Sequence, residues 1–141
     1  RRNAVYDTGG TTNHHNTWGI EASTGNVIDN TVSGLFAGTS GGTLYGIAVT
    51  GVGSQARDNT VSGFDMTAAQ GGTVSKAIGI RVISARQRAS GNQVVGGSVG
   101  NTITGTGIEG ASSSYCRGND VGGFTTNIHS DCISIGNQTG P

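Results

Sequence analysis

Two short phrases alternate along this chain of 141 residues, and this internal repeat restricts the fold more than any other feature. One phrase is Asn, any residue, then Val, and its two central copies extend to the identical hexapeptide Asp-Asn-Thr-Val-Ser-Gly. The other phrase, Gly-Ile, falls between successive copies of the first, and equivalent residues lie 27 to 33 positions apart. A period of this length indicates stacked repeats that bury a continuous core. The copies begin at Asn3, Asn30, Asn59, Asn92 and Asn119, and at Gly19, Gly46, Gly79 and Gly107.

Apolar and small residues alternate around each Gly-Ile phrase with a period of two, which is typical of a strand with two different faces. In the first repeat we predict that Trp18, Ile20 and Ala22 face the core, whereas Gly19 and Glu21 face solvent. The same parity places Tyr45 with the core residues of the second repeat. Stacking in register would then build an inward column of isoleucines from Ile20, Ile47, Ile80 and Ile108.

A third segment precedes each Asn phrase, and it predicts a third strand in every repeat. The residue three places before the Asn is small or apolar in each case, namely Val27, Ala56, Ala89 and Cys116. We place the Asn itself at a bend, facing inward, where its amide can hydrogen-bond the backbone and the next Asn of the stack. This column would consist of Asn30, Asn59, Asn92 and Asn119. The predicted fold is all-β, a right-handed parallel β-helix of about five coils with three short strands per coil.

Through the Gly-Ile-x-Val and Asn-x-Val-x-Gly phrases and the Asn column, the chain resembles the pectin-lyase-like superfamily of right-handed parallel β-helices. The resemblance runs from Asn3 to Asn137. It implies the fold but not an activity, because polysaccharide lyases, pectin hydrolases, phage tailspikes, epimerases and adhesins share this coil. Lyases of the family use calcium held by several Asp residues, and an Arg as base. Here Asp29 and Asp58 occupy one corner, but the next equivalents are glycines, so we expect neither calcium nor another cofactor.

Length and charge restrict the partners. The 141 residues suit one domain, and the Arg1-Arg2 start suggests a processed part of a longer chain. Eight basic residues balance eight acidic ones, which argues against nucleic-acid binding. No apolar run approaches the ~20 residues of a membrane helix, so we expect no membrane insertion. Cys116 and Cys132 allow one disulfide, with two buried thiols as the alternative, and a disulfide would suit a secreted, cell-surface or virion-surface protein.

The candidate catalytic residues are Arg81, Glu109 and Asp58. Arg81 and Glu109 would be neighbours one coil apart, so an ion pair is the simplest interpretation of these two. Glu21 and Glu109 would lie three coils apart, roughly 14 Å, which exceeds the separation of ~5–9.5 Å between the two carboxylates of a glycosidase. No metal site is predicted.

Loops of unequal length leave the same predicted edge of successive coils, at residues 8–17, 35–44, 64–77 and 97–105. Loops on one edge of a solenoid commonly wall a binding cleft, with plain solvated loops as the alternative. The candidate ligand-binding residues in or beside this edge are His14, His15, Glu21, Asp65 and Lys76.

Taken together, the sequence favours a secreted or surface-displayed β-helical scaffold or adhesin module. Its expected partners are polysaccharide or other copies of itself. The alternative is a fragment of a polysaccharide lyase, glycoside hydrolase or phage tailspike that acts on acidic polysaccharide.

Overall fold

Parallel sheets make up the whole of the regular structure in the computed structural model, which describes residues 1–6, 16–37, 41–68, 74–97 and 102–140. All fourteen strand pairings in this part of the chain are parallel. The prediction of an all-β chain with parallel sheets is therefore confirmed. No helix capable of crossing a bilayer occurs among the described residues.

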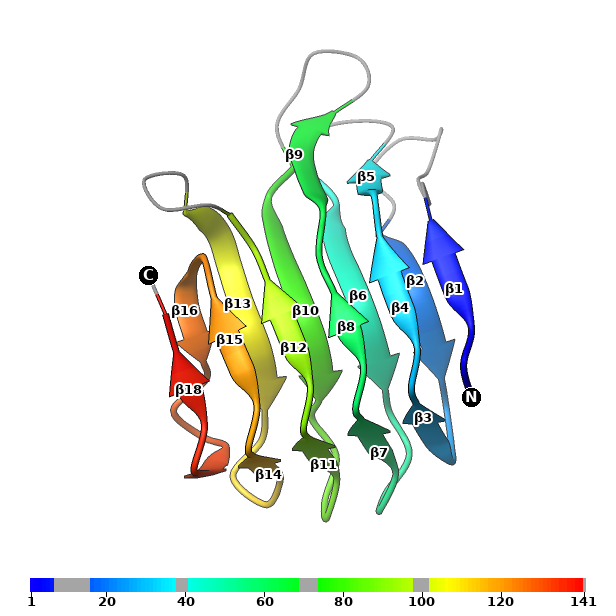
Figure 1. Ribbon diagram of the computed structural model, residues 1–141, viewed down its shortest axis with the longest axis vertical. Helices are drawn as coiled ribbons and strands as arrows, with labels where there is room; N and C mark the ends of the chain where they lie inside the picture. Colours follow the sequence, from blue (N-terminus) through cyan, green and yellow to red (C-terminus); the bar gives the residue numbers. More distant parts are fainter. Residues whose placement is uncertain (7–15, 38–40, 69–73, 98–101, 141) are drawn as a thin grey trace.

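Each repeat contributes one strand to each of three sheets, which we number by their first strand (Figure 1). The chain passes from sheet 2 to sheet 3 to sheet 1 and then begins again one strand further along. Sheet 2 has the longest strands, β2 (Thr17–Ala22), β6 (Thr43–Val49), β10 (Lys76–Val82), β13 (Ile103–Gly110) and β16 (Phe124–Ile128). Sheet 3 has β3 (Asn26–Ile28), β7 (Gln55–Arg57), β11 (Arg88–Ser90), β14 (Tyr115–Arg117) and β17 (Ile133–Ile135).

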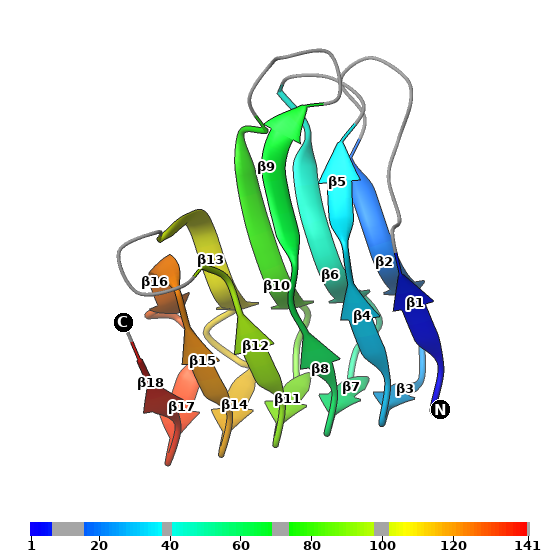
Figure 2. The ribbon, with the colours of Figure 1, turned by 45° about the horizontal axis from the view of Figure 1, so that its top comes forward.

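Sheet 1 lies at the front of Figure 1 and runs from one end of the row of strands to the other. Its strands are β1 (Ala4–Tyr6), β4 (Thr31–Ser33), β8 (Thr60–Val61), β12 (Gln93–Val95), β15 (Asp120–Gly122) and β18 (Gln138–Thr139). A small sheet 4 pairs β5 (Leu35–Ala37) with β9 (Phe64–Ala68) and continues sheet 1 upward for two repeats only (Figure 2).

The core lies between sheets 1, 2 and 3, because each sheet gives it one column of aligned side chains. Sheet 2 supplies the isoleucine column, whose members are paired in register. Sheet 1 supplies a valine column and sheet 3 the column that runs from Val27 to Cys116. Burying one large aliphatic side chain stabilises the fold by ~1.5–3 kcal/mol, and none of these columns exists within a single repeat. The innermost members are Ile47, Ile80 and Ile108, with Val32, Val61, Val94 and Val121, each fully buried.

The asparagine column forms a continuous ladder at the bend between sheets 3 and 1. In each rung the backbone N–H and the side-chain Nδ2 of one Asn both donate to Oδ1 of the next Asn, at 2.8–3.0 Å. The second Nδ2 proton of each interior Asn goes to a backbone carbonyl, so the buried amides are satisfied. The ladder has six members, Asn3, Asn30, Asn59, Asn92, Asn119 and Asn137.

The residue before each Asn of the ladder adopts a left-handed backbone conformation, with φ between 55° and 63°. This conformation crowds the Cβ of most residues, whereas Gly avoids the clash and Asp tolerates it better than most side chains do. The requirement explains why five of the six members of this column are Asp or Gly, namely Asp29, Asp58, Gly91, Gly118 and Gly136, with Arg2 as the exception.

The predicted outward orientation of the Gly column in sheet 2 is wrong. A Cβ added to Gly46 would lie 2.2 Å from Cγ1 of Val61, a buried residue of sheet 1, and the other three Gly-Ile glycines meet their valines at 2.2–2.3 Å. Only glycine fits at such a close approach. The strand alternation shifts by one residue at this point, since Leu44 and Ile47 both belong to the core although they are an odd number of residues apart.

The same shift overturns the placement of Trp18 and Tyr45 in the core. Both lie outside the core cluster, and Trp18 is 36% exposed. Leu44 and Ala77 belong to the core cluster instead, whereas Tyr45, at 7% exposed, is buried on the outer face of the sheet by Trp18 and Arg81.

The last repeat is joined covalently to the one before it. Cys116 on β14 and Cys132, just before β17, form a disulfide between residues 16 positions apart, and both are buried. Of the two interpretations of this cysteine pair, the structure has the bonded one.

Candidate functional site

Four side chains from successive strands pile up on the outer face of sheet 2. The rings of Trp18 and Tyr45 are stacked with centroids 5.6 Å apart and planes 8° from parallel. The guanidinium of Arg81 lies over the other face of Tyr45, 5.4 Å from its centroid. Arg81 then meets Glu109, with Nε and Oε2 separated by 2.8 Å. The pile therefore joins β2, β6, β10 and β13 side by side.

Arg81 and Glu109, two of the candidate catalytic residues, form an ion pair with each other. The two residues are aligned on neighbouring strands, and their side chains are 32% and 22% exposed. The contact is an ion pair rather than a linear hydrogen bond, because neither Arg81 Nε nor Glu109 Oε2 has a hydrogen-bond partner of normal geometry. Each of the two charges therefore has a partner of opposite charge within the fold.

The other charged candidates of sheet 2 stand apart from this pair. Glu21 is aligned with Ala48, which is itself aligned with Arg81, so a full strand separates the Glu21 and Arg81 positions. Lys76 is exposed at the start of β10, opposite Thr43. The structure therefore does not bring Glu21, Lys76 and Glu109 together.

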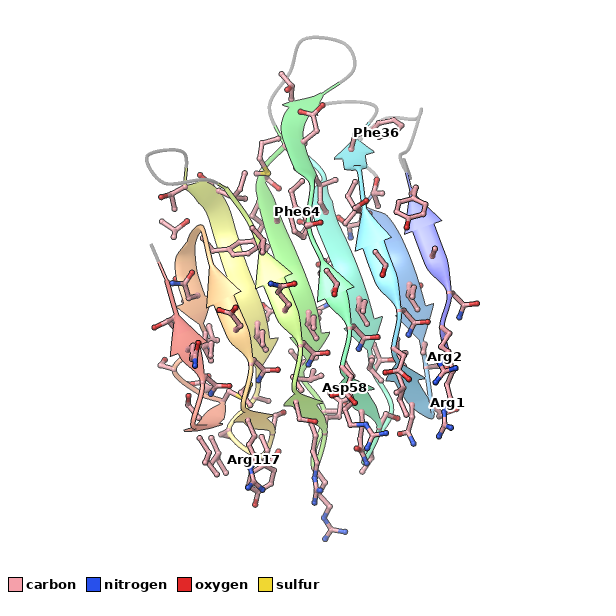
Figure 3. All side chains as sticks on the ribbon, in the orientation of Figure 1. Arg1, Arg2, Phe36, Asp58, Phe64 and Arg117 are labelled. Carbon is pink, nitrogen blue, oxygen red and sulfur yellow. A yellow bond between two sulfur atoms is a disulfide. The ribbon has the colours of Figure 1, made fainter. Side chains whose placement is uncertain are left out.

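Asp58 lies in a turn, and its backbone conformation and contacts indicate a structural role. Its φ is 55°, and its carboxylate pairs with Nε of the adjacent Arg57 at 3.2 Å (Figure 3). Asp29 has the same conformation one repeat earlier and faces Arg2 at 3.8 Å. In the part of the chain that the structure describes, no three His, Cys, Asp or Glu side chains gather into a group that could hold a metal ion.

Two of the three histidines, His14 and His15, lie outside the described residues. The third, His129, faces Asp131 with Nδ1 and Oδ2 separated by 3.7 Å, near the last repeat.

A cleft of about 800 Å³ opens between β9 and the start of β13, and it contains Asp65. Apolar side chains, among them Met66 and Val74, alternate around it with hydroxyl-bearing ones. The volume falls within the ~300–1,000 Å³ of typical small-ligand sites. The hydroxyl groups come from Thr67, Ser75, Thr102 and Thr104.

The end of sheet 4 creates this cleft. Sheet 4 extends sheet 1 only over the repeats of β5 and β9, and no third strand of sheet 4 follows in the described residues (Figure 2). Among the described residues β9 is the last strand of sheet 4, and Thr102 and Thr104, around the start of β13, line the step beside it. Phe64 supports the step from inside, because its ring meets Phe124 edge-on with centroids 5.6 Å apart.

Asp65 is held in a defined orientation at the rim of the cleft. Its Oδ1 accepts a hydrogen bond from the backbone N–H of Thr67 at 2.8 Å and another from the Thr67 hydroxyl at 2.5 Å. The Thr67 hydroxyl, followed by the Thr67 backbone N–H, holds the pKa of the Asp65 carboxyl below its usual value. The carboxylate is thus a fixed, charged acceptor beside a row of hydroxyl groups.

Sequence reasoning pointed to this edge and to Asp65, but it missed the four hydroxyl-bearing residues that share the cleft. One signal was present, since Thr102 and Thr104 flank Ile103 with the alternation of a strand that enters the core. The sequence does not indicate where sheet 4 ends. It therefore could not show that β9 lies across the cleft from this strand.

No family model, curated protein or solved structure matches this chain.

Proposed function

We propose that this protein is an extracellular or surface-displayed β-helical scaffold that contacts carbohydrate through the cleft between β9 and β13. The cleft carries the proposal because it combines a fixed carboxylate, four hydroxyl groups and apolar side chains on one edge of a repetitive stack. Sugars present hydroxyl groups and apolar C–H faces together, and this lining complements both. Loops and steps at the edge of a solenoid are common binding surfaces.

The scaffold is proposed to be a closed, right-handed coil of the pectin-lyase-like kind. Cyclic use of three parallel sheets around one core supports closure, and crossovers between parallel strands are right-handed in ~98% of cases. The disulfide supports an oxidising location, such as outside the cell or on a virion.

The proposed role is binding rather than catalysis. The pairing of Arg81 with Glu109 and the turn conformation of Asp58 give these three candidates structural roles that need no substrate. The cleft itself offers one carboxylate, Asp65, whereas glycoside hydrolysis ordinarily uses two.

Binding to neutral polysaccharides tests the proposal. Affinity electrophoresis through gels that contain xylan, galactomannan or soluble starch should show retardation in at least one of them. Asp65→Asn should weaken that retardation by about tenfold, since a hydrogen bond to a charged group contributes ~1.5–3 kcal/mol. Thr104→Val should weaken it about threefold, since a hydrogen bond between neutral groups contributes ~0.5–1.5 kcal/mol. Asp120→Asn is the matched control, because Asp120 is exposed on β15, away from the cleft.

Migration of the wild-type protein unchanged in every gel would contradict the proposal. Equal weakening by Asp65→Asn and Asp120→Asn would contradict the assignment to the cleft. Release of soluble oligosaccharides from any of these polymers would instead favour an enzyme.

A further inference from the structure

A shallow groove of about 580 Å³ runs along the outer face of sheet 3, on a different surface from the cleft. Three arginines and one tyrosine line it, together with smaller polar side chains and Ile135. Figure 3 shows Arg117 on the outside of the molecule, beside β14. The polar and aromatic members are Gln55, Arg57, Arg88, Ser90, Tyr115 and Arg117.

Strand register places these side chains in two outward columns. One column contains Arg57, Ser90 and Arg117 on successive strands, and the other contains Gln55, Arg88 and Tyr115. The residues between the two columns, Ala56, Ala89 and Cys116, are fully buried. All six side chains therefore leave the same face of sheet 3.

The three arginines form a triangle around a small residue. Arg57 and Arg117 are two strands apart, roughly 9.6 Å at the usual strand spacing, and Ser90 leaves room between them. Arg88 enters from the neighbouring column on the same strand as Ser90. Its guanidinium lies 5.9 Å from the ring centroid of Tyr115, which orients it along the groove.

Positive charge is concentrated here although the whole chain is neutral. Three of its eight basic residues line this groove, and the chain has as many acidic residues as basic ones. Arg57 shares its charge with Asp58, in a pair whose side chains are about half exposed. Arg88 and Arg117 make no ion pair within the described residues. The groove thus keeps two uncompensated guanidinium groups beside an aromatic ring.

We propose that this groove binds an anionic glycan, with Arg88, Arg117 and Arg57 contacting its sulfate or carboxylate groups and Tyr115 packing against a sugar ring. A guanidinium binds such anions through two parallel hydrogen bonds. Tyr115 is 41% exposed and Ile135 48%, so the groove also presents an apolar surface. The spacing of Arg57 and Arg117 suits a linear polymer that lies across the strands and presents anions about two strand spacings apart.

The groove's ligand is a glycan rather than a nucleic acid. Strong nucleic-acid binding uses many cationic contacts along a phosphate backbone, and this chain has no net positive charge to add to three arginines. The inference does not rest on the neutral-sugar cleft, because no residue lines both sites.

Dextran and dextran sulfate provide a matched pair of probes that differ only in charge. Affinity electrophoresis at low salt should show retardation by dextran sulfate, by alginate or polygalacturonate, or by both kinds. In a gel that contains dextran the protein should migrate as it does in a polysaccharide-free gel. Retardation by dextran sulfate alone would identify sulfate as the bound group, and retardation by alginate or polygalacturonate alone would identify carboxylate. Raising the salt should weaken the retardation, because the contacts are exposed.

The variant Arg88→Gln/Arg117→Gln should bind at least tenfold more weakly, from the ~1.5–3 kcal/mol of a hydrogen bond to a charged group. The control Arg86→Gln/Arg2→Gln removes the same charge from exposed positions outside the groove and should bind within twofold of wild type. Asp65→Asn should also leave anionic binding intact, which separates this site from the cleft. Circular dichroism of each variant establishes that it is folded.

Equal loss in the control and groove variants, or retardation by neutral dextran equal to that by dextran sulfate, would overturn the proposal. So would tighter binding of a DNA duplex than of any anionic glycan.

Discussion

Single residues at one corner carry much of the specificity of this fold. At the bend before sheet 1, a residue with a left-handed backbone conformation turns the chain. The Asn that follows it hydrogen-bonds to the equivalent Asn of the next repeat. The Asn amides are almost completely buried, between 1% and 3% exposed in the four interior repeats. A buried polar group without a partner costs ~1–3 kcal/mol, so each amide depends on its neighbours.

Replacing Asn59 by Ala should lower the free energy of unfolding by about 3 kcal/mol or more. The substitution removes the acceptor of two Asn30 donors and the donor to the carbonyl of Val27. Urea denaturation followed by circular dichroism measures the change. Asn26→Ala on the exposed face of β3 is the control, with an expected change within ~0.5 kcal/mol. Equal effects of the two substitutions would mean that the ladder does not stabilise the stack.

Carbohydrate binding in the cleft should be insensitive to mild acid. The hydrogen bonds from Thr67 lower the pKa of Asp65 below the ordinary Asp value of ~3.9, so its carboxylate stays ionised at pH 5. A lowered pKa also means that its contribution to stability is present above the ordinary value and is lost as the pH falls through the lowered one. Affinity electrophoresis at pH 7 and pH 5 should give the same retardation, and a marked loss at pH 5 would count against Asp65 as the acceptor.

At the scale of elements, most strands are short, and they gain stability from alignment with equivalent strands of other repeats. Sheet 2 shows this on both faces, with isoleucines aligned inside and the Trp18, Tyr45, Arg81 and Glu109 pile outside. The strands of sheet 3 have three residues each and bury a column of mostly small side chains, Val27, Ala56, Ala89 and Cys116. The disulfide reinforces the stack where the aliphatic side chains of this column end.

Reduction of the disulfide should destabilise the protein by about 3 kcal/mol, the value expected for closing a loop of this length. Denaturation midpoints with and without dithiothreitol measure the shift. A Cys116→Ala/Cys132→Ala variant should show the lowered stability in both conditions and no response to the reductant. A wild-type midpoint that does not move on complete reduction would show that packing alone holds β17 in place.

The repeat phrases predicted these elements well, because one residue per repeat recurs at each structurally equivalent position. Periodicity failed at Gly46 and its equivalents, where glycine lets the strand shift its alternation, and this reversed the predicted faces of Trp18 and Tyr45. It failed again at the three arginines of the groove, because Arg57 and Arg117 share one position of the repeat whereas Arg88 occupies another. They share a groove only because the two outward columns of sheet 3 lie side by side.

At the scale of the whole molecule, closure of the coil is a prediction with a direct spectroscopic test. If the three sheets enclose one core in solution, the methyl groups of Val61 should give strong nuclear Overhauser contacts to the α protons of Gly46. The pairs Val32 with Gly19, Val94 with Gly79, and Val121 with Gly107 should do the same. Absence of all four contacts in a folded sample would exclude the coil.

The asparagine ladder also bears on how such a protein changes in length. From Asn3 to Asn119 every side-chain amide donates in the same direction along the stack, and from Asn30 to Asn137 every Oδ1 receives the same pair of donors. A tandem duplication of one repeat would therefore add one Asn whose amide and Oδ1 can hydrogen-bond to the Asn residues of the repeats on either side. Growth by whole units needs no new kind of hydrogen bond, whereas loss or gain of a partial unit would move the Asn out of the column and leave buried donors and acceptors without partners.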